Sequence, residues 1–180
     1  MLKGVKLRDY QEKILDDLSC VPAIGLFMKT GSGKTLTSLE RFSRNPTSNL
    51  LVICPQKVVT QWIDVIKEHT DLKVLEYNMN WSAKRKNDII NDYLLDDFNP
   101  RKCVVVNFDI ITKMEWDWAI DDDWTIIVDE SHKIKNMGTV RKPTQITKKV
   151  LELGELTTYK IILTATPTEK EFGGYIDFYS

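Results

Sequence analysis

The chain contains a glycine-rich run, Met28-Lys-Thr-Gly-Ser-Gly-Lys-Thr35, between an apolar stretch and a segment with helical character. Glycine at positions 31 and 33 lets the backbone adopt dihedral angles that aim several N–H groups at one anion. Lys34 can reach the β- and γ-phosphates of a nucleoside triphosphate, and the Thr35 hydroxyl can ligate Mg²⁺. The run therefore predicts a phosphate-binding loop whose nucleotide contacts come from Thr30, Gly31, Ser32, Gly33, Lys34 and Thr35.

One position departs from the common pattern Gly-x-x-x-x-Gly-Lys-Thr, because Met28 stands where that pattern has glycine. A flexible glycine turn between a strand and a helix is the simpler alternative. The Gly-Lys-Thr triplet, however, stands directly at the start of the expected helix, where free backbone N–H groups favour an anion. We therefore favour phosphate binding.

A pair of acids, Asp129 and Glu130, follows the apolar run Trp124–Val128. Such a run is typical of a buried strand, so the acids emerge at its carboxyl end, where open α/β sheets bind ligands. A pair of solvated surface acids is the alternative, and the presence of the phosphate loop weighs against it. We expect Asp129 to hold Mg²⁺, directly or through water, and Glu130 to orient or deprotonate the attacking water.

Composition is that of an ordinary globular domain, with 42% hydrophobic and 28% charged residues in a chain of 180. No apolar run approaches the roughly 20 residues of a membrane helix, and the N-terminal sequence lacks the apolar core of a signal peptide. Cys20, Cys54 and Cys103 form no CxxC pair, and the two histidines are too far apart to predict a metal site. We expect reduced thiols in a cytoplasmic protein without membrane contact.

The net charge of −1 is not that of a typical nucleic-acid binder, but the charges are unevenly distributed. Residues 131–151 contain no acid and carry six basic side chains, which are Lys133, Lys135, Arg141, Lys142, Lys148 and Lys149. This stretch predicts either a nucleic-acid-facing surface or a solvated basic face, and the pattern alone leaves both open.

Apolar runs of strand length recur along the chain with helical patterns between them. The expected strands are Ile24–Met28, Leu50–Cys54, Val74–Tyr77, Cys103–Asn107, Thr125–Val128 and Tyr159–Leu163. The expected helices are Thr35–Ser43, Val58–His69, Ala83–Leu95, Asp109–Trp116 and Thr144–Leu153, the last with Pro143 in its first turn. This alternation predicts one α/β domain over residues 1–180, with a mostly parallel central sheet and helices on both faces.

Ahead of the first strand, Leu7-Arg-Asp-Tyr-Gln11 opens an amphipathic helix with Ile14, Leu15 and Leu18 on one face. The amide of Gln11 can offer a donor and an acceptor to the edge of an adenine base. A surface glutamine on a helix is equally compatible with this position.

Taken in order, these segments resemble the motifs of the first motor domain of superfamily 2 helicases, most closely the Swi/Snf-type DNA translocases. The matching segments are Leu7–Gln11 for the glutamine motif, Met28–Thr35 for motif I, Leu51–Pro55 with Gln61-Trp62 for motif Ia, Asp129–His132 for motif II and Leu163–Pro167 for motif III. Val105–Asp109 takes the place of the next DNA-proximal motif with a poorer match, and Ser131 stands where the family more often has Ala or Gly. The resemblance covers nearly the whole chain.

This resemblance implies a RecA-like fold that binds ATP with Mg²⁺, with Arg8 and Gln11 at the nucleotide. It implies that His132, Thr164 and Thr166 sense the γ-phosphate and report it to the DNA-binding surface. Families of this kind continue with a second RecA-like domain that carries an arginine finger. We therefore expect either a longer parent protein or a second chain to complete the motor.

The resemblance also implies a nucleic-acid track, with double-stranded DNA favoured over RNA and translocation favoured over strand separation. The residues expected along it are Pro55, Gln56, Lys57, Asn107, Phe108, Lys133 and Lys135.

Two other functions use part of this pattern. A phosphoryl-transfer enzyme on a small substrate has the same loop but needs neither the glutamine motif nor motif III. A catalytically silent nucleic-acid-binding module has no need for Lys34, Asp129 and Glu130 together.

Overall fold

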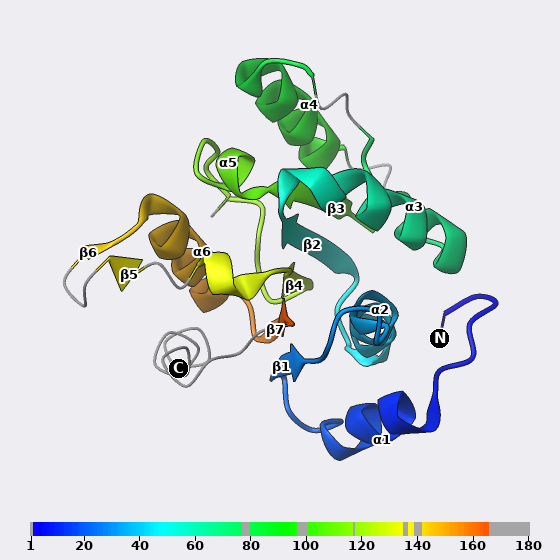
Figure 1. Ribbon diagram of the computed structural model, residues 1–180. Helices are drawn as coiled ribbons and strands as arrows, with labels where there is room; N and C mark the ends of the chain where they lie inside the picture. Colours follow the sequence, from blue (N-terminus) through cyan, green and yellow to red (C-terminus); the bar gives the residue numbers. More distant parts are fainter. Residues whose placement is uncertain are drawn as a thin grey trace.

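The centre of the protein is a five-stranded parallel sheet in the order β1-β7-β4-β2-β3 (Figure 1). The computed structural model describes residues 2–76, 80–96, 101–116, 118–134, 137–138 and 142–165. The strands are β1 (Ala23–Phe27), β2 (Asn49–Cys54), β3 (Cys103–Asn107), β4 (Trp124–Val128) and β7 (Tyr159–Thr164). All four pairings are parallel, so the carboxyl ends of the strands lie at one edge.

Helices cover both faces of this sheet. One face is covered by α2 (Lys34–Arg44) and α3 (Val59–His69), the other by α4 (Ala83–Leu95), α5 (Phe108–Ile111) and α6 (Gln145–Leu156). Helix α1 (Asp9–Asp17) lies beside α2, near the β1 edge (Figure 1). Short elements complete the described chain, namely the 3₁₀ turns η1 (Gln56–Val58) and η2 (Ser131–Lys133) and the antiparallel pair β5 (Met137–Gly138) and β6 (Lys142–Pro143).

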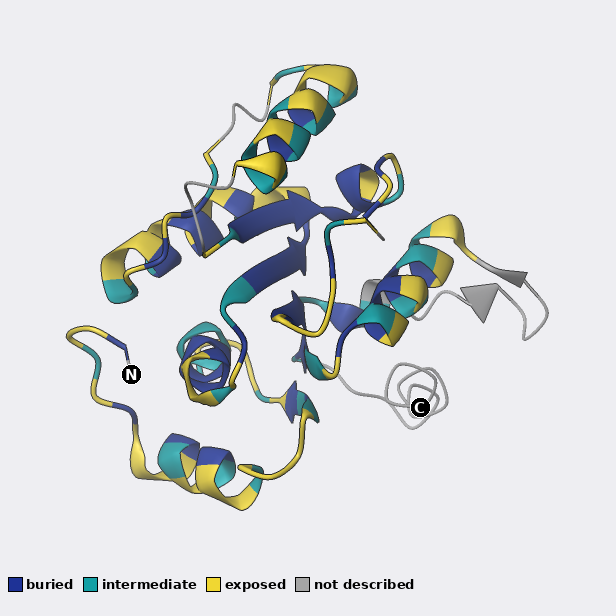
Figure 2. Cartoon of the chain, turned by 180° about the vertical axis from the view of Figure 1, so that it is seen from behind, coloured by how far each residue is buried: buried dark blue, intermediate teal, exposed yellow. Residues whose placement is uncertain are grey.

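The strands are apolar along most of their length because helices cover both faces of the sheet. On β2, Leu50 and Val52 pack with α2 and α3, while Leu51 and Ile53 pack with the helices of the opposite face. Figure 2 shows the strands buried along most of their length and the helices buried on one side only. A residue on either face of a central strand is therefore removed from water, which stabilises the fold by roughly 25 cal/mol per Å² of apolar surface.

Helix α1 is fastened to α2 by a cluster of charges around Arg44. Its guanidinium lies 2.5 Å from Glu12 and 3.0 Å from Asp16 on α1, and 3.1 Å from Glu40 on α2. Exposed ion pairs contribute little singly, but Glu40 is buried and the three pairs share one cation. The cluster fixes α1 against the helix that begins at the phosphate loop.

The expected fold class is confirmed, and five of the six expected strands are found within one residue at each end. Of the range Val74–Tyr77, Val74 forms an isolated bridge with Cys103, and Tyr77 lies outside the described residues. No helix in the described ranges is both long and apolar enough to cross a membrane.

Two of the helix expectations are wrong in detail. The helix expected over Asp109–Trp116 ends at Ile111, because the chain turns there and buries Trp116, whose indole donates to the Ile111 carbonyl at 3.2 Å. Pro143 does not lie in the first turn of α6 but in β6. Thr144 caps α6 instead, since its hydroxyl accepts a hydrogen bond from the Thr147 amide at 3.2 Å.

Candidate active site

The candidate residues that follow or end a strand all lie at the carboxyl edge of the sheet. The phosphate loop follows β1, Pro55 follows β2, Asn107 ends β3, Asp129 follows β4 and Thr164 ends β7. Open parallel sheets bind ligands at this edge, because the loops that follow several strands meet there.

Two glycines give the phosphate loop its shape. Gly31 and Gly33 have φ angles of 78° and 85°, in the left-handed region that other residues occupy only with strain. Gly33 is also the N-cap of α2, so the free N–H groups of the helix start face the loop. A Cβ on Gly33 would lie 2.6 Å from the Gln11 amide nitrogen, so any other residue here would displace the Gln11 side chain from its contacts as well as strain the backbone.

The ammonium group of Lys34 lies inside the loop. It donates to the carbonyl of Met28 at 2.9 Å and to that of Lys29 at 3.2 Å. The Met28 amide donates to the Thr164 carbonyl at 3.2 Å, which ties the loop to the end of β7. These contacts use only the backbone of Met28, so the loop closes without glycine at that position.

Gln11 supports the loop from α1. The residue is only 4% exposed, and its amide donates to the Thr37 hydroxyl at 2.8 Å and to the Ser32 carbonyl at 3.3 Å. Its oxygen accepts from the Arg8 amide at 2.8 Å, and the neighbouring Tyr10 hydroxyl donates to the Ser32 carbonyl at 2.6 Å. The sequence did not indicate that Gln11 would contact the phosphate loop. Recognition of adenine by Gln11 and Arg8 stays a prediction.

The carboxylate of Asp129 is held at both oxygens. The backbone amide of Glu130 donates to Oδ1 at 2.8 Å, and the indole of Trp62 donates to Oδ2 at 2.9 Å. Burial raises the pKa of Asp129 above its ordinary value, while these two hydrogen bonds and the charge of Lys34 act in the opposite direction. The two N–H donors fix the orientation of the carboxylate.

Glu130 has a backbone conformation that is rare outside glycine. Its φ and ψ of 52° and 49° lie in the left-handed region, which costs a residue with a Cβ about 1–2 kcal/mol. Glu130 Oε2 lies 3.1 Å from Nδ1 of His132, an ion-pair distance without the alignment of a hydrogen bond. Strain of this kind is held by surrounding structure and is frequent where a side chain must point into a site.

One cavity joins the phosphate loop to the acid pair. It has a volume of about 440 Å³ and is bordered by Lys34, Thr35, Asp129 and Glu130. The remaining lining residues come from the loop and from α2, α3 and the turn before it, and are Thr30, Gly31, Gly33, Leu36, Val58, Gln61, Trp62, Val65 and His69. The sequence predicted no role at the site for the residues of α3, and the match of Gln61-Trp62 to motif Ia was the signal that pointed to them.

The donor set of this cavity suits a magnesium ion. Mg²⁺ prefers oxygen ligands, usually one or two protein groups together with phosphates and water. The Thr35 hydroxyl and the Asp129 carboxylate border the same cavity, so the residues fit such an ion.

The expected sensing residues are partly in place. Thr164 is buried at the end of β7, beside β1 and β4. His132 follows the acid pair in η2 and lies next to Glu130. Thr166 lies outside the described residues.

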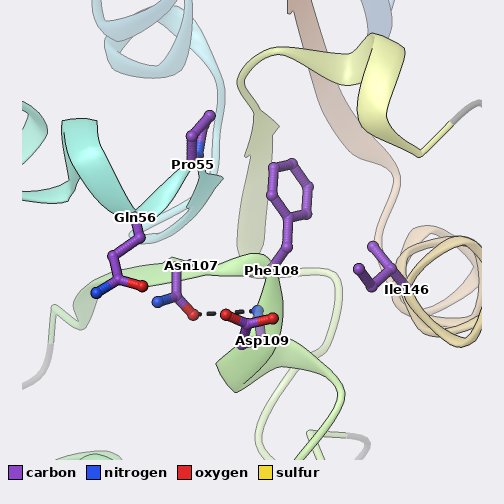
Figure 3. A pocket seen from close by; sticks show the side chains of 6 residues that line it. All are labelled: Pro55, Gln56, Asn107, Phe108, Asp109 and Ile146. Carbon is purple, nitrogen blue, oxygen red and sulfur yellow. Dashed lines mark hydrogen bonds between the residues drawn. The ribbon is translucent and has the colours of Figure 1, made fainter.

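A second hollow lies at the ends of β2 and β3. It has a volume of about 260 Å³ and brings together Pro55, Gln56, Asn107 and Phe108 with Asp109, the last residue of the segment Val105–Asp109, and Ile146, which the sequence did not indicate (Figure 3). The oxygen of Asn107 caps α5, because it accepts from the amides at 109 and 110 at 3.1 and 2.9 Å.

Exposure differs among the residues expected to face nucleic acid. Asn107 and Phe108 are mostly buried, whereas Gln56 and Lys57 are exposed. The side chain of Lys133 and the whole of Lys135 lie outside the described structure. The structure therefore offers Gln56 and Lys57 as the surface side chains at this end of β2.

Known proteins that are similar to this chain belong to the same class that the site at this edge indicates. A family model described as the SNF2-related domain matches residues 18–180. The chain belongs to this family. Family and fold agree with the resemblance in the sequence, which is that of a Swi/Snf-type ATPase domain with a RecA-like fold.

Two solved structures are similar to this SNF2-related domain in fold. The SWI2/SNF2 ATPase core of Sulfolobus solfataricus in complex with dsDNA has a TM-score of 0.74 and 23% identity, over 97% of this chain and 36% of that one. The Hef helicase domain of Pyrococcus furiosus has a TM-score of 0.68 and 16% identity, over 96% of this chain and 36% of that one.

A curated relative is similar in sequence over part of the chain. This Arabidopsis thaliana protein is a putative SWI/SNF-related matrix-associated actin-dependent regulator of chromatin, subfamily A member 3-like 1. It is 27% identical over an alignment of 97 residues, which covers 48% of this chain and 10% of the relative. The SNF2-related domain thus corresponds to a small part of that protein.

The first prediction concerns Gly33. Replacement by Ala places a Cβ against Gln11 and forces a left-handed residue, so we expect the affinity for ATP to fall by about tenfold or more, which corresponds to about 1.4 kcal/mol. The matched control is Gly4→Ala, because Gly4 has a φ of 64° and nothing within 4 Å of its Cβ position. Both variants should lose stability in denaturant titrations, but only Gly33→Ala should lose affinity in calorimetric titrations with ATP. Equal ATP affinity of the two variants would contradict the assignment of the loop.

Proposed function

We propose that this domain binds ATP with Mg²⁺ in the 440 Å³ cavity and hydrolyses it to drive movement of a complete motor along double-stranded DNA. The observation that carries the proposal is the meeting of Lys34, Thr35, Asp129 and Glu130 around one cavity. These are the cation, hydroxyl and two carboxylates that phosphoryl transfer to water requires. ATP and DNA meet inside the cell, so the proposal includes an intracellular location.

Each residue has a distinct part in this proposal. Lys34 exchanges its contacts with the loop carbonyls for the β- and γ-phosphates, and the loop amides hold the remaining phosphate oxygens. Thr35 and Asp129 would hold Mg²⁺, which when bound supplies charge neutralisation at the phosphates. Glu130 orients the attacking water and accepts its proton. His132, Thr164 and Thr166 would sense the γ-phosphate.

The complete motor needs a second RecA-like domain, in the same protein or in a partner. An arginine finger is worth ~10³–10⁵ in turnover in other phosphoryl-transfer enzymes. No arginine borders the cavity in the described part of this domain. We propose that the second domain supplies this cation and that the domain alone binds ATP while hydrolysing it very slowly.

The proposed DNA path runs along the carboxyl edge, past Gln56 and Lys57 and towards Lys133 and Lys135. Support comes from the exposure of Gln56 and Lys57 and from the similarity in fold to an ATPase core solved with dsDNA. Contacts to phosphates suit a motor that steps over any sequence, because phosphates carry no sequence information. With a net charge of −1 we expect weak binding, on the order of 10⁻⁴–10⁻⁶ M.

The second prediction separates binding from hydrolysis. Lys34→Ala should weaken ATP binding to the domain, because it removes the cation at the phosphates. Glu130→Gln should retain binding, because the phosphate contacts remain, and should abolish hydrolysis in the complete motor. The measurements are calorimetric titration of the domain with ATP and phosphate release by the DNA-bound motor. Near-normal turnover of Glu130→Gln would remove Glu130 from the catalytic role.

The third prediction concerns the DNA path. Lys57→Glu should weaken binding of a DNA duplex at low salt and reduce the slope of log K against log salt by ~0.9, the value for one phosphate. ATP affinity should stay the same. The matched control is Lys73→Glu, an equal charge change at an exposed site next to Val74, which pairs with the first residue of β3 at the opposite edge.

Fluorescence anisotropy of a labelled duplex measures both variants. If Lys57→Glu and Lys73→Glu bind DNA equally, the effect is one of net charge, and the carboxyl edge is not the DNA path.

A further inference from the structure

The buried indole of Trp62 is the side-chain donor that holds the carboxylate of Asp129. Trp62 lies on α3, is only 2% exposed and donates to Oδ2 at 2.9 Å across 67 residues of sequence. Its ring packs in the apolar cluster between α2, α3 and the sheet, so the position of the N–H is set by the core. A buried donor with a charged acceptor forms one of the stronger hydrogen bonds in proteins.

Two donors are needed to orient a carboxylate. The Glu130 amide fixes Oδ1, but this contact alone leaves the group free to turn about the axis of that hydrogen bond. The Trp62 indole fixes Oδ2 and thereby sets the plane of the carboxylate. Among the described residues each oxygen accepts one hydrogen bond, so the contacts leave a lone pair on each oxygen for a ligand or an ordered water.

We propose that Trp62 is a positioning residue that aims the Asp129 carboxylate at Mg²⁺. This inference rests on the proposed function and assigns a role to a residue of motif Ia within the metal site. Groups that hydrogen-bond a metal-ligating carboxylate typically change metal affinity by ~10–100-fold when they are removed.

The test is Trp62→Phe, which keeps an aromatic ring in the core and removes the N–H. The matched control is Trp116→Phe, because Trp116 is also fully buried and donates its N–H to a backbone carbonyl far from the acid pair in sequence. ATP affinity of the domain is measured by calorimetry in EDTA and across a series of Mg²⁺ concentrations. The Mg²⁺ concentration at which half of the gain in ATP affinity is reached, here called the Mg²⁺ midpoint, reports how tightly the metal binds. The affinity in EDTA reports binding of the nucleotide without metal.

We expect Trp62→Phe to raise the Mg²⁺ midpoint by ~10-fold or more and to change the affinity in EDTA by much less. Trp116→Phe should change neither value. An unchanged Mg²⁺ midpoint in Trp62→Phe, or an equal loss in EDTA, overturns the inference and leaves the proposed function standing. Failure of the wild-type domain to bind ATP at all overturns the proposed function and this inference with it.

A second measurement uses the wild-type domain alone and so does not depend on whether a variant folds. In the wild-type domain saturated with ATP, the indole N–H resonance of Trp62 should shift when Mg²⁺ is added, whereas that of Trp116 should not. Assignment of the resonances comes from selective labelling and sequential connectivities. A Trp62 resonance that does not respond to Mg²⁺ overturns the inference.

Discussion

The parallel register of the sheet is the constraint on which the site depends. Since all described pairings of the central sheet are parallel, every strand delivers its carboxyl end to one edge. Loops from distant parts of the sequence therefore meet there, with the phosphate loop and the acid pair around one cavity and the ends of β2 and β3 around another. The apolar cover on both faces holds the strands in place, because successive residues of a central strand pack against opposite helix layers.

Around that edge, reactive groups are held by contacts from outside their own loops. Gln11 and Tyr10 on α1 both donate to the Ser32 carbonyl of the phosphate loop, and the Arg44 cluster holds α1 against α2. Trp62 on α3 holds Asp129, while the strained backbone of Glu130 turns its side chain at the end of β4. Such preorganisation is what phosphoryl transfer demands, since catalysis there is mostly positioning and charge neutralisation.

Local sequence was enough to predict much of this arrangement. The glycines before Lys34 and the acids after Trp124–Val128 can be recognised from a few adjacent residues. The helix Ala83–Leu95 begins where it was expected because Ser82 caps it. Contacts between distant segments were beyond prediction, because the meeting of Trp62 with Asp129 or of Gln11 with Thr37 depends on helix packing. Asn107 shows a further limit, since an amide after a strand can cap a helix or bind a ligand, and here its oxygen caps α5.

The most direct test of the account is a crystal structure of this domain with Mg²⁺ and a non-hydrolysable ATP analogue. We expect phosphates against the amides of residues 31–35, the Lys34 ammonium on the β- and γ-phosphates, and the metal between Thr35 and Asp129. Trp62 should keep its hydrogen bond to Asp129. A nucleotide bound elsewhere, or a metal that contacts neither Thr35 nor Asp129 directly or through water, would contradict it.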